Sequence, residues 1–328
     1  MTDTSPVDHI LSRVGGQAGA AAALLAPDGA TVLAEYRYQV AQVFPLASSF
    51  KLFVLHALLE DAAAGRVDLD HAIPTRRAVA SLGDRKPGLT PLRRLAEMMI
   101  YHSGNTASDV LFKQVGLAAP QRLIARLGLA QTRVVLPTRE YYVIIAGLDP
   151  EFPADDLPAA AARFAALPPV AQVALVEGVG ARSADRTLRA IEEATMDFYA
   201  YRRYNRPQSY AILDNVDNVS TPTAMLRLMR YLHTGGDLPP PQAAELRRIL
   251  ARGDGARDAG CFHGQAQSWG GKGGDDLSQA SMQGYATAAD GRTLVYSLLA
   301  GHLHDDYRGS RRLCQAVGAL WDAWLGAG

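Results

Sequence analysis

Residues 44–51 read Phe44-Pro45-Leu46-Ala47-Ser48-Ser49-Phe50-Lys51, a stretch that combines a helix start with a chemically useful pair of side chains. The hydroxyl of Ser48 and the amine of Lys51 stand three residues apart, so one helical turn would place them on the same side. Serine becomes a strong nucleophile only when a base takes its proton, and a lysine kept neutral by burial and by a second cation is such a base. Taken alone, the pattern also fits a serine that simply caps a helix over 48–64.

Lysine is scarce in this chain of 328 residues, which has four lysines, at 51, 86, 113 and 272, against 29 arginines. Arginine supplies surface charge equally well, but its guanidinium does not release a proton in a protein. The lysines at 51 and 272 both fall in short motifs, which indicates positions where a releasable proton matters.

Two further motifs follow in the chain. Ser103-Gly104-Asn105 offers a second hydroxyl for proton relay and an amide that can bind a substrate carbonyl or amide, although a turn between two helices would also look like this. Lys272-Gly273-Gly274 precedes a late hairpin, where glycine lets a ligand lie against a strand; a flexible glycine loop is the plainer interpretation. Chance rarely supplies the three motifs in this order.

In this order the motifs resemble those of the penicillin-recognising serine hydrolases, meaning class A β-lactamases and related acyl-transfer enzymes, over about residues 19–325. Ser220-Thr221-Pro222 is similar to the Thr-Thr-Pro helix start of that family. The resemblance implies that Ser48 is the acylated nucleophile and Lys51 its base. It also implies that Ser103 passes the proton to the leaving nitrogen and that Asn105 binds the side-chain amide of the substrate.

The resemblance also implies roles for the Lys272-Gly273-Gly274 motif and for the residue that follows it. Lys272 would set the electrostatics of the site, and Gly273 and Gly274 would lie along the substrate. The backbone N–H groups of Ser48 and Asp275 would form the oxyanion hole. Gly273 replaces a threonine of the family pattern and removes a hydroxyl that usually grips a substrate carboxylate.

The segment that should supply a deacylating base departs from the family pattern. Thr138 falls where class A enzymes have their catalytic glutamate, and Glu140 could replace it only if the loop shifts. The alternative for Glu140 is a surface carboxylate paired with Arg139. With these departures the chain resembles a divergent branch of serine hydrolases related to β-lactamases, which includes a hydrolase of the clavulanic-acid pathway.

We therefore expect a serine hydrolase that acts through a covalent acyl-enzyme, foremost on β-lactams. Two alternatives stay open: an esterase or amidase of a biosynthetic or detoxifying pathway, and a β-lactam-binding protein that acylates but barely deacylates.

The resemblance implies a β-lactamase/transpeptidase-like α/β fold, with an antiparallel sheet flanked by helices and an inserted all-helical subdomain. We expect a single catalytic unit with an α/β subdomain of residues 1–47 plus 220–328 and a helical subdomain of residues 48–219. The periodicity and the turn signals predict strands at 19–25, 31–38, 283–288 and 293–300. They predict helices at 6–14, 48–64, 90–101, 106–115, 120–127, 158–177, 183–200, 222–233, 242–250 and 311–325.

The stretch 143–218 is longer than in compact class A enzymes and carries a Tyr/Arg cluster at 199–204. This cluster either lines the site or forms a solvated helix face, and we expect the second.

Composition narrows the partners. The chain has 33 basic and 33 acidic residues and is 48% hydrophobic, so nothing points to nucleic acid or to an anionic membrane surface. We expect a monomer that binds a small molecule and needs no metal or organic cofactor, without a membrane span. The start lacks a secretory signal, so the protein is either cytoplasmic or secreted with its leader removed. Cys261 and Cys314 are expected to be two buried thiols rather than a disulfide.

Overall fold

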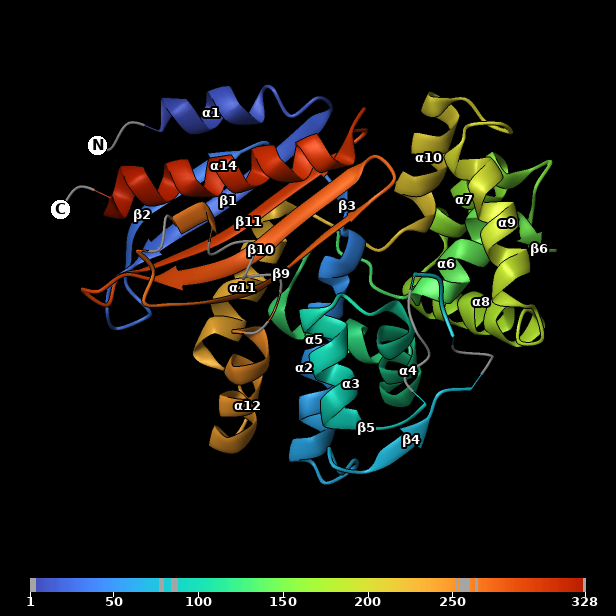
Figure 1. Ribbon diagram of the computed structural model, residues 1–328, viewed down its shortest axis with the longest axis horizontal. Helices are drawn as coiled ribbons and strands as arrows, with labels where there is room; N and C mark the ends of the chain where they lie inside the picture. Colours follow the sequence, from blue (N-terminus) through green and yellow to red (C-terminus); the bar gives the residue numbers. More distant parts are fainter. Residues whose placement is uncertain are drawn as a thin grey trace.

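The computed structural model describes residues 4–76, 80–83, 88–251, 253, 260–262 and 265–326, and Lys86 lies outside them. The two ends of the chain form one antiparallel sheet in the order β2-β1-β11-β10-β9 (Figure 1). Its strands are β1 (Gln17–Leu25), β2 (Val32–Tyr38), β9 (Ser268–Asp276), β10 (Gln279–Thr287) and β11 (Thr293–Gly301). The expected α/β fold with an antiparallel sheet is confirmed.

Strand β1 is buried on both faces, which explains its run of alanines. Ala20 and Ala22 pack into one hydrophobic core, whereas Ala23 and Leu25 pack into the other. Small side chains let helices approach the sheet closely from both sides.

Helices cover both faces of the sheet (Figure 1). Helices α1 (Ser5–Leu11) and α14 (Asp306–Leu325) pack on one face, and α11 (Pro222–Thr234) packs on the other. A disulfide joins Cys261, in the short helix η3 (Gly260–Phe262), to Cys314 of α14. The expectation of two free thiols is therefore wrong: the fold brings the two Cα atoms to 5.5 Å, a distance at which a disulfide forms readily.

The helical part of the chain is built around α2 (Lys51–Ala63), which is buried along nearly its whole length. The helices near it are α3 (Leu92–Tyr101), α4 (Asn105–Val115), α5 (Ala119–Leu127) and α12 (Pro240–Leu250), and two short strands, β4 (Ala72–Pro74) and β5 (Leu89–Pro91), pair beside them. None of the described helices is both long and apolar enough to cross a membrane.

The long stretch after residue 137 forms a second group of helices. They are α6 (Thr138–Ile145), α7 (Leu157–Ala166), α8 (Pro169–Arg182), α9 (Leu188–Tyr199) and α10 (Arg206–Val216), with the short pair β6 (Leu148–Asp149) and β7 (Phe152–Pro153). The expected helix over 158–177 is two helices, because Pro168 and Pro169 interrupt it. Helix α10 was not predicted, although its capping box at Asn205 and Gln208 is visible in the sequence.

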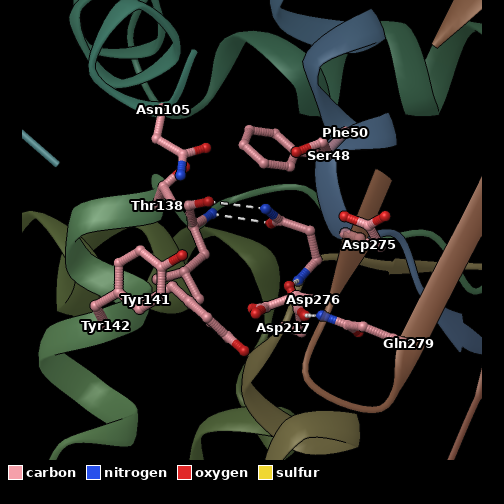
Figure 2. Close-up of a pocket in the computed structure, with 13 residues that line it drawn as sticks. Ser48, Phe50, Asn105, Thr138, Tyr141, Tyr142, Asp217, Asp275, Asp276 and Gln279 are labelled. Carbon is pink, nitrogen blue, oxygen red and sulfur yellow. Dashed lines mark hydrogen bonds between the residues drawn. The ribbon is translucent and has the colours of Figure 1, made fainter. Parts of the chain in front are cut away.

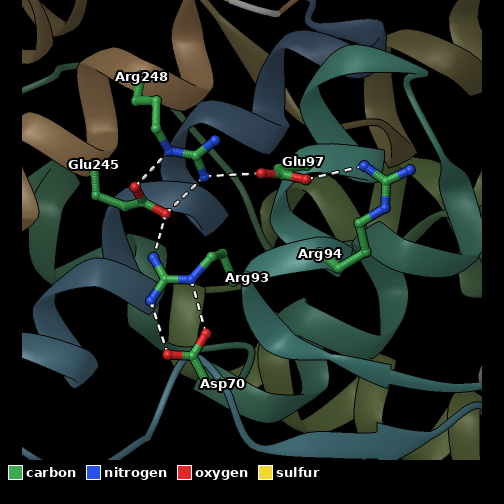
Figure 3. A network of polar contacts seen from close by, with 6 residues as sticks. All are labelled: Asp70, Arg93, Arg94, Glu97, Glu245 and Arg248. Carbon is green, nitrogen blue, oxygen red and sulfur yellow. Dashed lines mark hydrogen bonds and ion pairs between the residues drawn. The ribbon is translucent and has the colours of Figure 1, made fainter.

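A network of ion pairs connects α3 to α12 (Figure 3). Arg93 contacts Glu245 at 2.6 Å and Arg248 contacts Glu97 at 2.8 Å, so each helix supplies both a cation and an anion. Asp70 and Arg94 extend the network at its two ends. The network therefore fixes α12 against α3, although the two helices are far apart in the sequence.

Candidate active site

A short strand pair positions the serine. Strand β3 (Phe44–Pro45) pairs with β8 (Val219–Ser220), and the chain then enters the 3₁₀ turn η1 (Ala47–Phe50). Ala47 has φ of 43°, in the left-handed region that non-glycine residues rarely adopt. A strained residue beside Ser48 is typical of a functional site, because it is held there by the surrounding structure.

The amine of Lys51 lies at the centre of the site. Its side chain is 0% exposed, and Nζ lies 3.1 Å from Ser48 Oγ. The same Nζ lies 2.5 Å from the backbone oxygen of Ser103, 3.2 Å from Ser103 Oγ and 2.9 Å from Asn105 Oδ1. The structure thus brings four of the expected residues together through one ammonium or amine.

Two elements hold the second motif in place. Ser103 follows α3 and has φ of 55°, another left-handed non-glycine residue. Asn105 is the first residue of α4, and its Nδ2 donates a hydrogen bond of 3.1 Å to the carbonyl of Leu82. The amide is therefore fixed with its oxygen toward Lys51.

Strand β9 carries the third motif and is connected to the serine turn by Ser49. This side chain is buried, and its hydroxyl donates to the carbonyl of Lys272 at 3.2 Å. It also lies 2.7 Å from Ser281 Oγ and contacts Gln283 on β10. Lys272 is itself buried, and its Nζ donates a hydrogen bond to the carbonyl of Gly273. Sequence reasoning missed Ser49, Ser281 and Gln283, whose only signal is a polar side chain in an otherwise buried position.

The backbone of β9 passes directly against Ser48. A Cβ added to Gly274 would lie 2.3 Å from the backbone nitrogen of Ser48, so only glycine fits there. Gly273, Gly274 and Asp275 line the cleft together with Ser48. Ser48 and Asp275 are the two residues expected to supply oxyanion N–H groups.

Glu140 lies elsewhere. It is 1% exposed and pairs with Lys113 of α4 at 2.6 Å, and it is not among the residues that line the pocket beside Ser48. The structure also contradicts the alternative of a surface pair with Arg139, whose buried guanidinium donates to the carbonyls of Ala80 and Ser183. Helix α6 turns Glu140 toward α4, while Thr138 and Tyr142 face the pocket.

The pocket on the Asn105 side of Ser48 has walls from several elements (Figure 2). Asp109 accepts hydrogen bonds from the N–H groups of Thr138 and Arg139, both at 2.7 Å, and so fixes the start of α6. Asn218 accepts from the N–H groups of Val135 and Leu136 and thereby holds the segment that leads into α6.

Two carboxylates with shifted titration lie in this pocket. Burial and the neighbouring charge of Asp276 raise the pKa of Asp217 to about 7, although a hydrogen bond from Gln279 acts in the opposite direction. Burial also raises the pKa of Asp276. Both groups are therefore more easily protonated than ordinary aspartates.

The Tyr/Arg cluster divides between two roles. Tyr199 donates a hydrogen bond of 2.6 Å to Asp276 and so connects α9 to the pocket wall, which contradicts the expectation that the whole cluster is solvated. Tyr204 is buried, whereas Arg202 and Arg203 are exposed as expected.

A second, wider hollow opens on the other side of Ser48. Ser103, Gly273 and Met282 line it together with residues of α14 such as Tyr307 and Arg311. Ser48 therefore stands between a pocket that includes Asn105 and a cleft that includes Ser103.

One further polar group lies apart from the residues that line these hollows. His56, Glu60 and Asp237 place potential ligand atoms within 4.8 Å of one another. Arg126 pairs with Glu60 at 2.7 Å and with Asp237 at 3.4 Å, so the negative charges of this group already have a partner.

Comparisons with known proteins agree with this architecture. A family model described as "Beta-lactamase enzyme family" matches residues 7–324. The extended-spectrum β-lactamase PER-1 of Pseudomonas aeruginosa is 30% identical over 102 residues, which are 28% of this chain and 33% of that protein. The match thus spans about a third of the length of this curated relative.

Solved structures match along almost the whole chain. A β-lactamase from Sphaerobacter thermophilus superposes with a TM-score of 0.67 and 20% identity, covering 98% of this chain and 97% of that one. PBP-A superposes with a TM-score of 0.66 and 18% identity, covering 99% and 96%. A mutant of PBP-A, solved as an acyl-enzyme complex with penicillin G, matches with a TM-score of 0.66 and 17% identity, again covering 99% and 96%. At these identities the likeness shows the fold.

Proposed function

The chain belongs to the beta-lactamase enzyme family, and from this premise we propose that it is a serine hydrolase that forms a covalent ester at Ser48. The observation that carries the proposal is the position of the buried Lys51 Nζ, 3.1 Å from Ser48 Oγ. A neutral amine has two N–H donors and one lone pair. Lys51 Nζ donates its two hydrogen bonds to the backbone oxygen of Ser103 and to Asn105 Oδ1, which leaves the lone pair for the Ser48 proton.

The first half-reaction follows from this arrangement. Ser48 Oγ attacks the substrate carbonyl carbon while its proton moves to Lys51. The N–H groups of Ser48 and Asp275 hold the resulting oxyanion, an interaction typically worth about 3–4 kcal/mol per donor. The carbon–nitrogen or carbon–oxygen bond then breaks, and the leaving atom takes a proton through Ser103.

The substrate that we propose foremost is a β-lactam. In this proposal Lys272, buried on β9 beside the serine turn, supplies positive charge, and Asn105, which lines the pocket, offers its amide to the acyl side chain. Water then cleaves the Ser48 ester and regenerates the free hydroxyl.

A second candidate function has a specific observation in its favour. Thr138 and Tyr142 line the pocket where a water-activating glutamate is expected, and Glu140 pairs with Lys113 instead. A protein with this pocket would acylate readily and deacylate slowly, as a β-lactam-binding protein does. In the remaining alternative, an esterase or amidase without β-lactamase activity, small activated esters would turn over while penicillins would not.

Intact-protein mass spectrometry separates these functions. The protein is mixed with a penicillin, a cephalosporin and an activated ester and sampled from seconds to hours, with Ser48→Ala as the control. Product release without a persistent adduct supports hydrolysis of that substrate. A lasting adduct that Ser48→Ala abolishes supports slow deacylation, and no adduct or product with any of the three contradicts the proposed function.

A further inference from the structure

The proposed mechanism assigns the two hollows beside Ser48 to different parts of a substrate. If Ser103 delivers the proton to the leaving atom, the cleft lined by Ser103 and α14 receives the leaving group. The pocket lined by Asn105, Tyr141 and Tyr142 then receives the acyl side chain. The chemistry of this second pocket therefore describes the acyl group, an inference that rests on the proposed function.

Three aspartates line the acyl pocket, Asp217, Asp275 and Asp276 (Figure 2). Asp275 is exposed and is the residue expected to supply an oxyanion N–H, whereas Asp217 and Asp276 form a neighbouring pair. Asp217 is 6% exposed and accepts hydrogen bonds from Gln279 Nε2 at 2.9 Å and from the Asn218 N–H at 2.7 Å. Asp276 accepts from the Tyr199 hydroxyl at 2.6 Å and from the Leu277 N–H at 2.8 Å. All these partners are neutral, so each carboxylate is oriented without being neutralised.

Neither carboxylate forms an ion pair with any part of the chain that the structure describes. The positive charge of Arg133 acts to lower the pKa of Asp217, but its guanidinium donates to the backbone carbonyl of Asp217 rather than to the carboxylate. Two adjacent carboxylates in a buried pocket repel each other, and burial without a counter-charge is costly. The raised pKa of Asp217 is the consequence of both effects.

An independent feature also indicates a hydrogen-bond donor from outside the protein. The side chain of Gln279 is 2% exposed, and its Oε1 has no hydrogen-bond partner although its Nε2 is bound to Asp217. A buried acceptor without a donor is rare in proteins. Gln279 lines the same pocket as the two carboxylates, so one donor-bearing cation could satisfy all three groups.

The pocket suits an organic cation better than a metal ion. Among the described residues, His56, Glu60 and Asp237 are the one group of three potential metal ligands that lie within 4.8 Å of one another. Asp217 and Asp276 therefore have no third ligand at such a distance in this part of the chain. The rings of Phe50, Tyr141 and Tyr142 form part of the wall. Aromatic faces attract ammonium and guanidinium groups but are poor metal ligands.

We propose that the acyl part of the substrate carries a positively charged nitrogen, an ammonium or a guanidinium, that binds between Asp217 and Asp276 and donates to Gln279 Oε1. The insertion takes part in this recognition, because Tyr199 of α9 orients Asp276. Substrate specificity is thus divided: Ser48, Lys51 and Ser103 act on the acyl bond, and the acidic pocket selects the group attached to it.

The test compares esters that differ only in charge. The p-nitrophenyl esters of 6-aminohexanoate and 8-aminooctanoate are matched with those of heptanoate and nonanoate, which place a methyl group where the ammonium stands. The second-order rate of Ser48 acylation is measured for each pair in the wild type and in the variant Asp217→Asn/Asp276→Asn. Asparagine keeps an acceptor oxygen at each position, so the hydrogen bonds from Gln279 and Tyr199 are retained.

We expect at least one cationic ester to acylate the wild type at least tenfold faster than its neutral partner, and the ratio to fall to about one in the double variant. The ratio is taken within each protein, so it does not depend on the absolute rate of the neutral ester, and acylation of the double variant by the neutral esters shows that it is folded. Equal rates for both members of each pair in the wild type would overturn the inference while leaving the proposed function intact. A cationic preference that appears only after treatment with EDTA would mean that the carboxylates hold a metal ion, and would also overturn it. Failure of every ester to acylate Ser48 would instead count against the proposed function.

Discussion

At the scale of single residues, the site depends on whether the nitrogen at position 51 can accept a proton. Lys51 is fully buried and reaches oxygens of Ser48, Ser103 and Asn105 from one point. An arginine there would keep a positive charge but could not act as a base.

We predict that Lys51→Arg lowers the rate of Ser48 acylation by about a hundredfold or more, the usual contribution of a general base. Lys113→Arg is the matched control, because it makes the same replacement in a lysine that pairs with Glu140 and does not line either hollow. The rates are measured from adduct formation with an activated ester. Acylation by Lys51→Arg at the wild-type rate would remove the role proposed for Lys51.

The sequence was informative about residues that share a short motif and less so about residues that meet through the fold. Ser48 and Lys51, and Ser103 and Asn105, could be predicted because each pair lies within four residues. Ser49, Ser281 and Gln283 could not, since their contacts join η1 to β9 and β10 across more than 200 positions. Glu140 shows the limit of counting along the chain, because one turn of α6 decides which side chain faces the pocket.

At the scale of elements, strand β9 must lie against the serine turn for the cleft to form. The contact is possible because Gly274 has no side chain where the backbone of Ser48 approaches. The strand itself was the hardest part of the sheet to predict, since its glycines and charged residues lack the apolar run that marks β11.

We predict that Gly274→Ala separates β9 from the turn and reduces acylation at least tenfold, with a loss of about 1–3 kcal/mol in the free energy of unfolding from overpacking. The backbone nitrogen of Ser48 cannot move aside as a flexible side chain would. Gly301→Ala on β11 is the control, because its added Cβ would meet Pro45 and Phe44 only at 3.6 and 3.7 Å, ordinary contact distances. Equal effects of the two substitutions on acylation would contradict the role of this close approach.

At the scale of the whole molecule, contacts far apart in sequence close the fold. The Cys261–Cys314 disulfide ties η3 to α14, and the ion pairs between α3 and α12 join helices from different parts of the chain. Local patterns predict neither contact. Cys261 and Cys314 are 53 residues apart in the sequence, and strands β9, β10 and β11 lie between them, so only the folded sheet brings the two cysteines together. The sheet and most helices were predictable from periodicity, whereas the packing of the insertion against Asp276 was not.

The acidic pocket should also be visible in the stability of the whole protein. The pKa of Asp217 is raised to about 7 in the folded state, against about 3.9 in an unfolded chain. The folded state therefore binds this proton more tightly than the unfolded chain does. The stabilisation is fully present below pH 3.9 and is lost as the pH rises through 7.

We predict that between pH 5 and pH 8 the free energy of unfolding of the wild type falls by about 2–3 kcal/mol more than that of Asp217→Asn. Urea denaturation of both proteins at these two pH values measures the difference. His233, whose pKa is lowered by burial, titrates in the same range with the opposite effect, but it is present in both proteins and cancels in the comparison. Parallel pH dependence in the two proteins would mean that Asp217 ionises normally in the folded state, and the pocket would then lack the uncompensated charge on which recognition of a cationic acyl group depends.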